Sequence, residues 1–169
     1  APVFSGQQRL SDSQQHPDEE CLYTLLHAPQ EGHDRILDQF VTPIVAAIDS
    51  AVEVDSYFVA RYSEPEWQLR FRVMGRPAFV QQQVRPAIDA ALPALYTAGL
   101  VHQHEFARYE REWKRYGGAA GMRLCERYFR YDTAFCLFLV SLDFSAGLPK
   151  SRREISLLLA YEVTRELPM

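Results

Sequence analysis

Residues 57–75 read YFVARYSEPEWQLRFRVMG and predict two antiparallel strands joined by a tight turn. The turn is the run Ser-Glu-Pro-Glu, in which proline supplies the fixed backbone angle that such a turn favours. Closing the hairpin over these four residues would place Tyr62 opposite Trp67, and Arg61 opposite Gln68.

Because successive strand side chains point to opposite faces, the hairpin is expected to have an apolar face and an arginine face. The apolar face would carry Phe58, Ala60, Tyr62, Trp67, Leu69 and Phe71, and the opposite face would gather Arg61, Arg70 and Arg72. Neighbouring like charges repel, so a bound carboxylate or phosphate would explain the arginines. The alternative is a solvated face whose arginines pair with Glu64, Glu66 or Glu105.

The composition favours one globular domain in a reducing compartment. Of the 169 residues 47% are hydrophobic, which is enough for one core. Residues 1–19 are polar and predict a flexible N-terminal segment, which leaves 20–169 as a single α+β domain. The net charge of −4 gives no sign of nucleic-acid binding. Three widely spaced cysteines, Cys21, Cys125 and Cys136, favour the cytoplasm over a disulfide framework. Neither a membrane span nor a secretion signal is expected.

Hydrophobic periodicity predicts the order strand, helix, strand, strand, helix, strand. The expected elements are a strand at 21–27, a helix at 33–51 interrupted near Pro43, the hairpin at 54–74, a helix at 78–98 capped by Gly99, and a weak strand at 100–112. Two further helices are expected at 119–142 and 152–167. This order is typical of the split βαβ, or ferredoxin-like, arrangement, in which both helices cover one face of an antiparallel sheet. The arginine face would then be the open one.

A second group of candidate residues lies at 109–118, with the sequence YEREWKRYGG. Gly117 and Gly118 would open a helix with free backbone N–H groups that suit an anion, and Arg115 would add charge. The alternative is an ordinary glycine turn. His102 and His104 would share a strand face, as proton acceptors or as ordinary strand residues, and two histidines without a third ligand do not predict a metal. We expect neither a metal nor a cofactor, since the common phosphate, dinucleotide and zinc motifs are absent from the sequence.

Taken together, these stretches resemble the small C-terminal domain of lantibiotic dehydratases and thiopeptide-type bacteriocin biosynthesis proteins. That family has an aromatic strand ending in Arg-Tyr, then His-x-Arg-x-Arg, Tyr-x-x-Glu-x-x-Arg-Tyr-Gly-Gly, and an Asp-Ser motif. The matching residues are Arg61-Tyr62, Pro65, Arg70, Arg72, Tyr109, Glu112, Arg115, Tyr116, Gly117, Gly118 and Asp132-Thr133. The resemblance covers about residues 20–142, and its separate elements follow one another in the family's order.

The resemblance implies a lyase in the biosynthesis of a ribosomally made peptide. Such a lyase eliminates glutamate from glutamylated Ser or Thr and leaves dehydroalanine or dehydrobutyrine. The implied partners are a precursor peptide, with leader and core, and a glutamyl-tRNA-dependent glutamylating protein; a homodimer is a further expectation. One alternative is a thiopeptide pyridine synthase, which performs a formal [4+2] cyclisation with leader release. Another is a non-catalytic peptide-binding subunit of the dehydratase complex.

The resemblance also implies roles for individual residues. Catalysis would fall to Arg70, Arg72 and Arg115, and substrate binding to Arg61, Tyr62, Gln68, Tyr116, Gly117 and Gly118. Gln68 replaces the histidine that usually precedes Arg-x-Arg, and Thr133 replaces the usual serine. The family domain continues beyond the point that corresponds to Met169 and adds a further catalytic histidine. Three alternatives follow for this sequence. The domain is shortened, or a second subunit completes the site, or the elimination activity is lost or changed.

Overall fold

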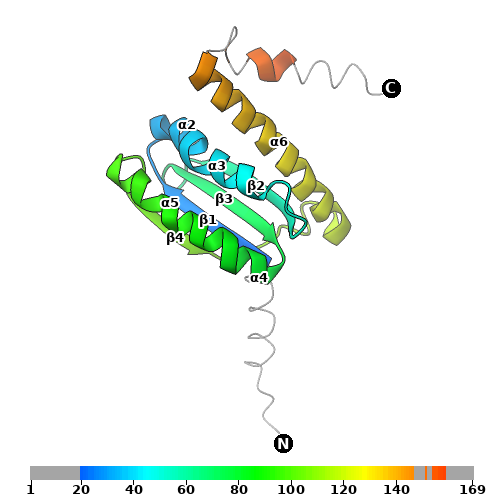
Figure 1. Ribbon diagram of the computed structural model, residues 1–169. Coiled ribbons are helices and arrows are strands. Elements are labelled where there is room, and N and C mark those ends of the chain that lie inside the picture. Colours follow the sequence, from blue (N-terminus) through cyan, green and yellow to red (C-terminus); the bar gives the residue numbers. More distant parts are fainter. Residues whose placement is uncertain (1–19, 147–150, 152–153, 159–169) are drawn as a thin grey trace, which may run out of the picture.

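The computed structural model describes residues 20–146, 151 and 154–158 (Figure 1). Four strands form one antiparallel sheet in the order β2-β3-β1-β4. Their bounds are β1 Cys21–His27, β2 Val54–Tyr62, β3 Gln68–Gly75 and β4 Gln103–Ala107. The α+β class and the four predicted strands are therefore confirmed. The predicted N-terminal segment and most of the helix expected at 152–167 lie outside the described residues.

Two interrupted helices connect the strands. The first comprises the short turn η1 Gln30–Gly32, then α2 His33–Ile36, η2 Leu37–Val41 and α3 Thr42–Ile48. The second comprises α4 Pro77–Phe79, η3 Val80–Val84 and α5 Arg85–Thr97. Both η2 and η3 are wider π turns, and Pro43 and Pro86 follow them in the first turn of the next segment. A proline interrupts the regular hydrogen-bond ladder, and in both helices it follows closely on a wider turn, so the interruption predicted near Pro43 takes the form of a π turn.

The hairpin register differs from the expected one by a single residue. Tyr62 pairs with Gln68, and Arg61 pairs with Leu69, because the connection uses five residues, 63–67, rather than four. Since side chains alternate, a shift of one residue transfers a whole strand to the opposite face. The expected division into an apolar face and an arginine face is therefore wrong.

The corrected faces have mixed chemistry. The three β2 residues expected on the apolar face instead share a face with Gln68, Arg70 and Arg72 of β3, in the pairs Phe58–Arg72, Ala60–Arg70 and Tyr62–Gln68. Arg61 instead lies opposite the fully buried Leu69 on the helix-covered face, where its guanidinium pairs with Asp34 of α2. Trp67 lies in the connection and contacts His33 edge to face.

The main core lies between the sheet and the two interrupted helices (Figure 1). Its largest buried side chains come from strands and helices alike and include Leu26, Ile36, Leu37, Phe40, Tyr57, Leu69, Phe71 and Ile88. Gly99 ends the second helix as expected: its N–H donates to the Tyr96 carbonyl, and the Leu100 N–H to that of Leu95. None of the described helices combines the length and apolar character that crossing a membrane requires.

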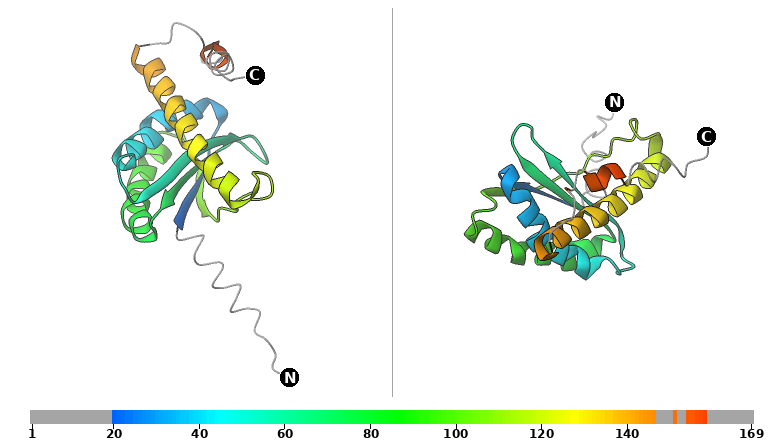
Figure 2. Two further views of the ribbon diagram at one scale, coloured as in Figure 1. Left: turned by 90° about the vertical axis from the view of Figure 1, so that its right-hand side faces the viewer. Right: turned by 90° about the horizontal axis from the view of Figure 1, so that it is seen from above.

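The helix α6, Gly118–Ala146, crosses the free edge of β2 diagonally (Figure 2). The backbone N–H of Val59 donates to Thr133 Oγ1 at 3.1 Å, and Ser56 Oγ donates to the Glu126 carbonyl at 2.7 Å. These bonds occupy polar groups of an edge strand that would otherwise face solvent or another strand. Farther along α6, Leu137 and Val140 join the main core.

Candidate functional site

The face of the sheet that α2, α3 and α5 leave uncovered carries side chains in ordered rows. The pairing gives one row of Tyr62, Gln68 and His27, a second of Ala60, Arg70, Leu25 and Glu105, and a third of Phe58, Arg72 and Tyr23. Neighbouring members of a row belong to strands about 4.8 Å apart. Polar groups therefore gather near the hairpin connection, and aromatic rings surround the arginine of the third row.

A cavity of about 640 Å³ lies over this face, between β2, β3, the segment 108–116 and α6. Its lining combines aromatic, cationic and acidic side chains: Tyr23, Leu37, Phe58, Val59, Ala60, Arg61, Tyr62, Arg70, Arg72, Arg108, Tyr109, Glu110, Glu112, Tyr116, Phe129, Asp132, Thr133 and Cys136. Five of the nine predicted site residues are in this set: Arg61, Tyr62, Arg70, Arg72 and Tyr116. Gln68, Arg115, Gly117 and Gly118 are not.

Arg72 is a buried cation with only 6% of its surface exposed. Its guanidinium carbon lies 4.0 Å from the ring centre of Tyr23 and 4.9 Å from those of Phe58 and Tyr109. Its Nε is buried without a hydrogen-bond partner among the residues that the structure describes. Aromatic faces attract a cation, but they do not replace the hydrogen bonds lost on burial. The Arg72 guanidinium therefore keeps an unused hydrogen-bond donor next to its three aromatic rings.

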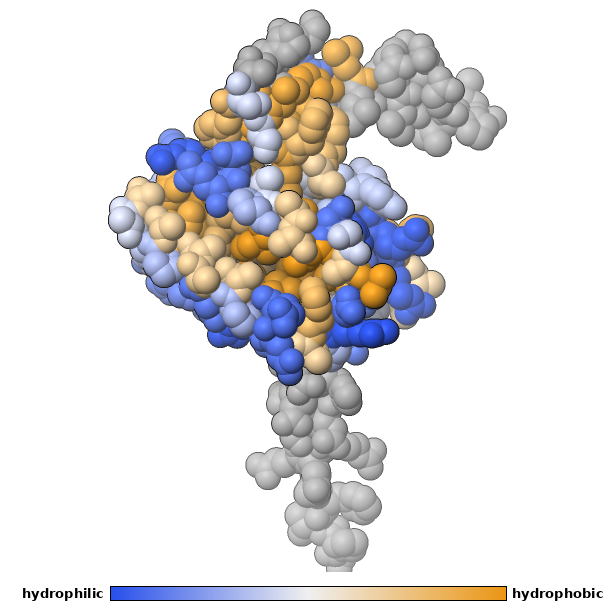
Figure 3. All heavy atoms as spheres, viewed as in Figure 1, coloured by the Kyte–Doolittle hydropathy of each residue, from blue (hydrophilic) through white to orange (hydrophobic). Residues whose placement is uncertain are grey.

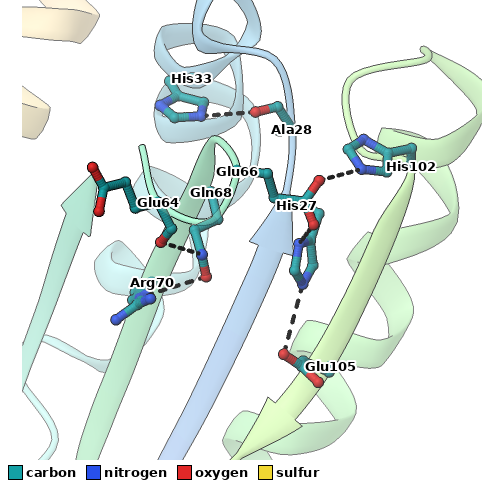
Figure 4. A network of polar contacts seen from close by, with 9 residues as sticks. All are labelled: His27, Ala28, His33, Glu64, Glu66, Gln68, Arg70, His102 and Glu105. Atoms are coloured by element: carbon teal, nitrogen blue, oxygen red, sulfur yellow. Dashed lines mark hydrogen bonds and ion pairs between the residues drawn. The ribbon is translucent and has the colours of Figure 1, made fainter. Parts of the chain in front are cut away.

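Arg70 lies in the neighbouring row with its guanidinium carbon 3.6 Å from the ring centre of Tyr62. Its Nε donates to Gln68 Oε1 at 3.2 Å, and Gln68 Nε2 donates to the Glu64 carbonyl at 3.4 Å (Figure 4). Gln68 does not line the cavity; it accepts a hydrogen bond from Arg70 and so helps to fix the position of that side chain. Within the described part of the chain, neither Arg70 nor Arg72 pairs with a carboxylate, in contrast to the expected alternative of a solvated, paired face.

A buried ion pair fixes the segment that closes the cavity. Arg111 Nε donates to Glu126 Oε1 of α6 at 2.6 Å, and both side chains are largely buried. Burial and the nearby Glu126 carboxylate raise the pKa of Tyr109, so its hydroxyl stays protonated at neutral pH. The Tyr109 ring packs edge-on against Tyr23 and Phe58. The segment thus completes the aromatic enclosure of Arg72.

The Arg-Tyr-Gly-Gly element forms the turn into α6. Gly117 and Gly118 have φ values of +75° and +82°, which side-chain-bearing residues rarely adopt. The Gly118 N–H donates to the Trp113 carbonyl at 2.7 Å, so this group is occupied within the turn rather than free for an anion. Arg115 is 71% exposed and pairs with Glu112 at 2.9 Å, and this hydrogen bond raises its pKa. Arg115 therefore lies outside the cavity, attached to the lining residue Glu112.

Close packing of this turn against α6 depends on Gly121. A Cβ atom at this position would overlap the Tyr116 backbone carbonyl. The Tyr116 ring lines the cavity and packs edge-on against Phe129 of α6. Gly121 therefore fixes how near this wall of the cavity comes to the helix.

Sequence reasoning missed a histidine–glutamate cluster at the end of the open face. His27 Nδ1 lies 2.7 Å from Glu66 Oε1, and its Nε2 lies 3.6 Å from Glu105 Oε1, beyond hydrogen-bond distance (Figure 4). His102 Nε2 approaches Glu66 Oε2 at 3.5 Å, whereas His104 bonds to the Tyr96 hydroxyl. The signal for His27 was its place at the end of the first strand, which pairing puts opposite Gln68.

Neither the cavity nor this cluster resembles a metal site. Among the described residues, no group of three or more His, Cys, Asp or Glu side chains has an arrangement that could hold a metal ion. The histidines of the cluster do not line the cavity.

Residues 22–166 match the family described as lantibiotic biosynthesis dehydratase C-term. The chain belongs to this family. It is 29% identical over 123 residues to the subtilin biosynthesis protein SpaB of Bacillus subtilis, an alignment that covers 73% of this chain and 12% of SpaB. The crystal structure of the tRNA dependent lantibiotic dehydratase MibB from Microbispora sp. 107891 is 31% identical, with a TM-score of 0.69 over 78% of this chain. The chain spans only 13% of MibB.

More distant structures share the fold alone. The pyridine synthase TbtD from thiomuracin biosynthesis has a TM-score of 0.54 at 14% identity, and TsrL has 0.52 at 22%. This chain covers 51% of TbtD and 39% of TsrL. The family model, SpaB and MibB confirm the sequence-based resemblance to the dehydratase family. TbtD and TsrL show that the same fold also occurs in proteins of low sequence identity to this chain.

Proposed function

We propose that this chain eliminates glutamate from glutamylated Ser or Thr residues of a precursor peptide, leaving dehydroalanine or dehydrobutyrine. The observation that carries the proposal is the pair Arg70 and Arg72 in the aromatic cavity, without a carboxylate partner among the described residues. A free glutamyl carboxylate and the departing glutamate are anions of the kind that two adjacent guanidinium groups bind well.

The reaction separates charge in a way that suits these arginines. A base removes the α-proton of the esterified residue, and the C–H electron pair forms the Cα=Cβ double bond. The bond between Cβ and the ester oxygen breaks, and its electron pair leaves with glutamate as a carboxylate. Cations fixed before the reaction stabilise this developing negative charge without having to reorganise. Loss of one such donor in other enzymes lowers kcat about 10²–10³-fold.

The two arginines would contribute differently because they are held differently. Arg72 is enclosed by three rings and cannot turn away, so it would bind the part of the anion that must be placed most accurately. Arg70 lies over Tyr62 and is supported by Gln68, nearer the hairpin. In this proposal the acidic lining residues Glu110, Glu112 and Asp132 would bind a positively charged part of the substrate.

The partners belong to the same proposal. SpaB and MibB are much longer proteins, and MibB is described as tRNA dependent. We therefore expect a glutamylating protein to supply the glutamylated precursor peptide to this chain, by way of glutamyl-tRNA. In the elimination proposal Arg115, Tyr116 and the adjacent glycines shape the rim through which the peptide enters.

The test is incubation of the purified chain with a chemically glutamylated precursor peptide, followed by mass spectrometry. We expect loss of the glutamyl mass together with formation of a thiol-reactive alkene, and no loss with Arg72→Gln. If glutamate stays attached even when the glutamylating partner is present, the elimination proposal is wrong. A six-membered nitrogen heterocycle formed with leader release would indicate the pyridine synthase alternative. Unchanged pathway output with lost partner binding in Arg72→Gln would indicate a non-catalytic subunit.

A further inference from the structure

The helix α6 has a second apolar face that nothing in the described fold covers. Four large side chains, Leu124, Tyr128, Tyr131 and Phe138, are each between 60% and 68% exposed. At 3.6 residues per turn they lie on the side opposite Thr133 and Leu137, which pack against β2 and the core. We call these four residues the outer stripe; it extends about 21 Å along the helix axis.

A surface helix normally has one apolar face, which packs on the core, and one polar face. In α6 the second face is apolar too, and it is bordered by the exposed charges Arg123 and Arg127 on one side and Asp132 on the other. Large contiguous apolar surface inside a charged rim is typical of a protein–protein interface. The aromatic residues of the stripe belong to the type that interfaces favour.

A groove continues the outer stripe at the C-terminal half of α6. It has a volume of about 520 Å³ and is lined by Asp38, Phe138, Ser141, Leu142, Phe144 and Ser145. Figure 3 shows the apolar surface that gathers over this part of α6. Phe138 belongs to both the outer stripe and the groove, so a partner could contact them together.

We propose that the outer stripe is the docking surface for the larger, glutamylating part of a lantibiotic dehydratase. This chain corresponds to 12% of SpaB and 13% of MibB, so in each of these relatives the matching domain belongs to the same chain as a much larger portion. The occupant is an apolar protein surface of that portion with acidic residues facing Arg123 and Arg127. The inference rests on the proposed function, because elimination must follow glutamylation.

The position of the outer stripe fits the order of the two reactions. The opposite side of the same helix lines the cavity through Phe129, Thr133 and Cys136, and Asp132, at the border of the stripe, also lines it. Docking through the outer stripe would therefore leave the cavity open to the peptide. A glutamylated residue could reach the arginines without release of the complex.

The test uses the full chain and, as the probe, SpaB without the segment that this chain matches, shown to be folded by circular dichroism. Binding is measured by isothermal titration calorimetry and by co-elution in size-exclusion chromatography. Leu124→Glu combined with Tyr131→Glu is expected to weaken binding about a hundredfold or more, since two large apolar contacts are lost. Val52→Glu is the control, because Val52 is 85% exposed and belongs to the connection before β2 rather than to α6. Both variants should keep the wild-type Tm.

Three results would overturn the proposal. These are binding of the stripe variant that equals wild type, no complex between wild type and the probe, and a wild-type dimer that the stripe variant converts to a monomer. The last result would mean that a second copy of this chain covers the stripe. Elimination from free glutamylated peptide, measured on the same samples, separates the two proposals. A chain that binds the probe but releases no glutamate contradicts the proposed function and leaves the docking surface in place.

Discussion

The hydroxyl of Thr133 accepts the backbone N–H of Val59 at 3.1 Å, and together with the bond from Ser56 to the Glu126 carbonyl it joins α6 to the edge strand of the sheet. Thr133 is almost fully buried, so no water can replace it there. Threonine supplies the hydroxyl that this bond needs, as would the serine of the motif that the sequence resembles.

Replacing Thr133 tests this explanation. Thr133→Val keeps the shape but leaves the Val59 N–H buried without a partner, which should cost about 1–3 kcal/mol of unfolding free energy. Thr133→Ser should cost less, because the hydroxyl remains. Urea denaturation of both variants measures the difference. A larger loss in Thr133→Ser than in Thr133→Val would mean that packing of the methyl group, rather than the hydrogen bond, holds α6 to β2.

Substitution of Arg72 should separate stability from function. Arg72→Met removes a buried charge without a carboxylate partner in the described region, and such replacements by apolar residues are often neutral or stabilising. Elimination by the same variant should fall by about 10²-fold or more. The measurements are Tm by calorimetry and the rate of glutamate release. A large fall in Tm would show that the guanidinium is needed mainly for packing among its three rings.

The ion pair of Arg111 and Glu126 predicts a strong asymmetry between single and double variants. Glu126→Gln leaves the Arg111 charge largely buried and unpaired, and should cost about 3–5 kcal/mol. Combining Arg111→Met with Glu126→Leu should recover much of this loss, since neither charge remains. Chemical denaturation of the single and double variants gives the coupling. Additive losses would contradict a direct interaction between the two side chains.

Stability should also fall in mild acid because of His33. This side chain is fully buried, its Nε2–H donates to the Ala28 carbonyl, and burial lowers its pKa below the ordinary value of 6.5. A depressed histidine pKa means that the folded state favours the neutral ring. Its contribution is therefore complete above pH 6.5 and is lost as the pH falls below that value. Urea midpoints at pH 7.5 and 5.5 should differ less in His33→Gln than in wild type. An unchanged difference would assign the acid sensitivity to other groups.

Substitution of Arg115 tests whether the rim of the cavity guides the peptide. Because its side chain is mostly exposed, Arg115→Ala should leave Tm unchanged. If the rim guides the peptide, KM should rise and kcat should change little. Lys114→Ala is the matched control, as it removes a neighbouring charge from the same turn. An equal change in both variants would indicate a general charge effect.

Much of the fold could be predicted from local patterns. Alternation and helical spacing located four strands and the main helices, and the Arg-Tyr-Gly-Gly element marked the start of α6. The register could not be predicted, since it depends on whether Trp67 belongs to the strand or to the connection. Contacts between distant segments decided that, including the packing of Trp67 on His33. The same limit hid His27, whose glutamate neighbours come from the connection and from β4.

The candidate site was predicted in part for the same reason. Arg70 and Arg72 lie in the cavity because their spacing of two residues puts them on one strand face regardless of register. Arg61 reaches the cavity from the other face of β2, which alternation alone could not indicate. Gln68 was expected to contact substrate, yet its partner Arg70 lies two residues along the same strand.

If the cavity performs the proposed elimination, the contact between Gly121 and the Tyr116 carbonyl makes the breadth of accepted substrates adjustable from outside the cavity. Any larger residue at this position must push the Tyr116 backbone away from α6, and the Tyr116 ring would move with it. Gly121→Ala is thus expected to alter the ratio of reaction rates on threonine-derived and serine-derived esters, which differ by one methyl group. Selection among peptides could act on this glycine while every residue that touches the substrate stays the same.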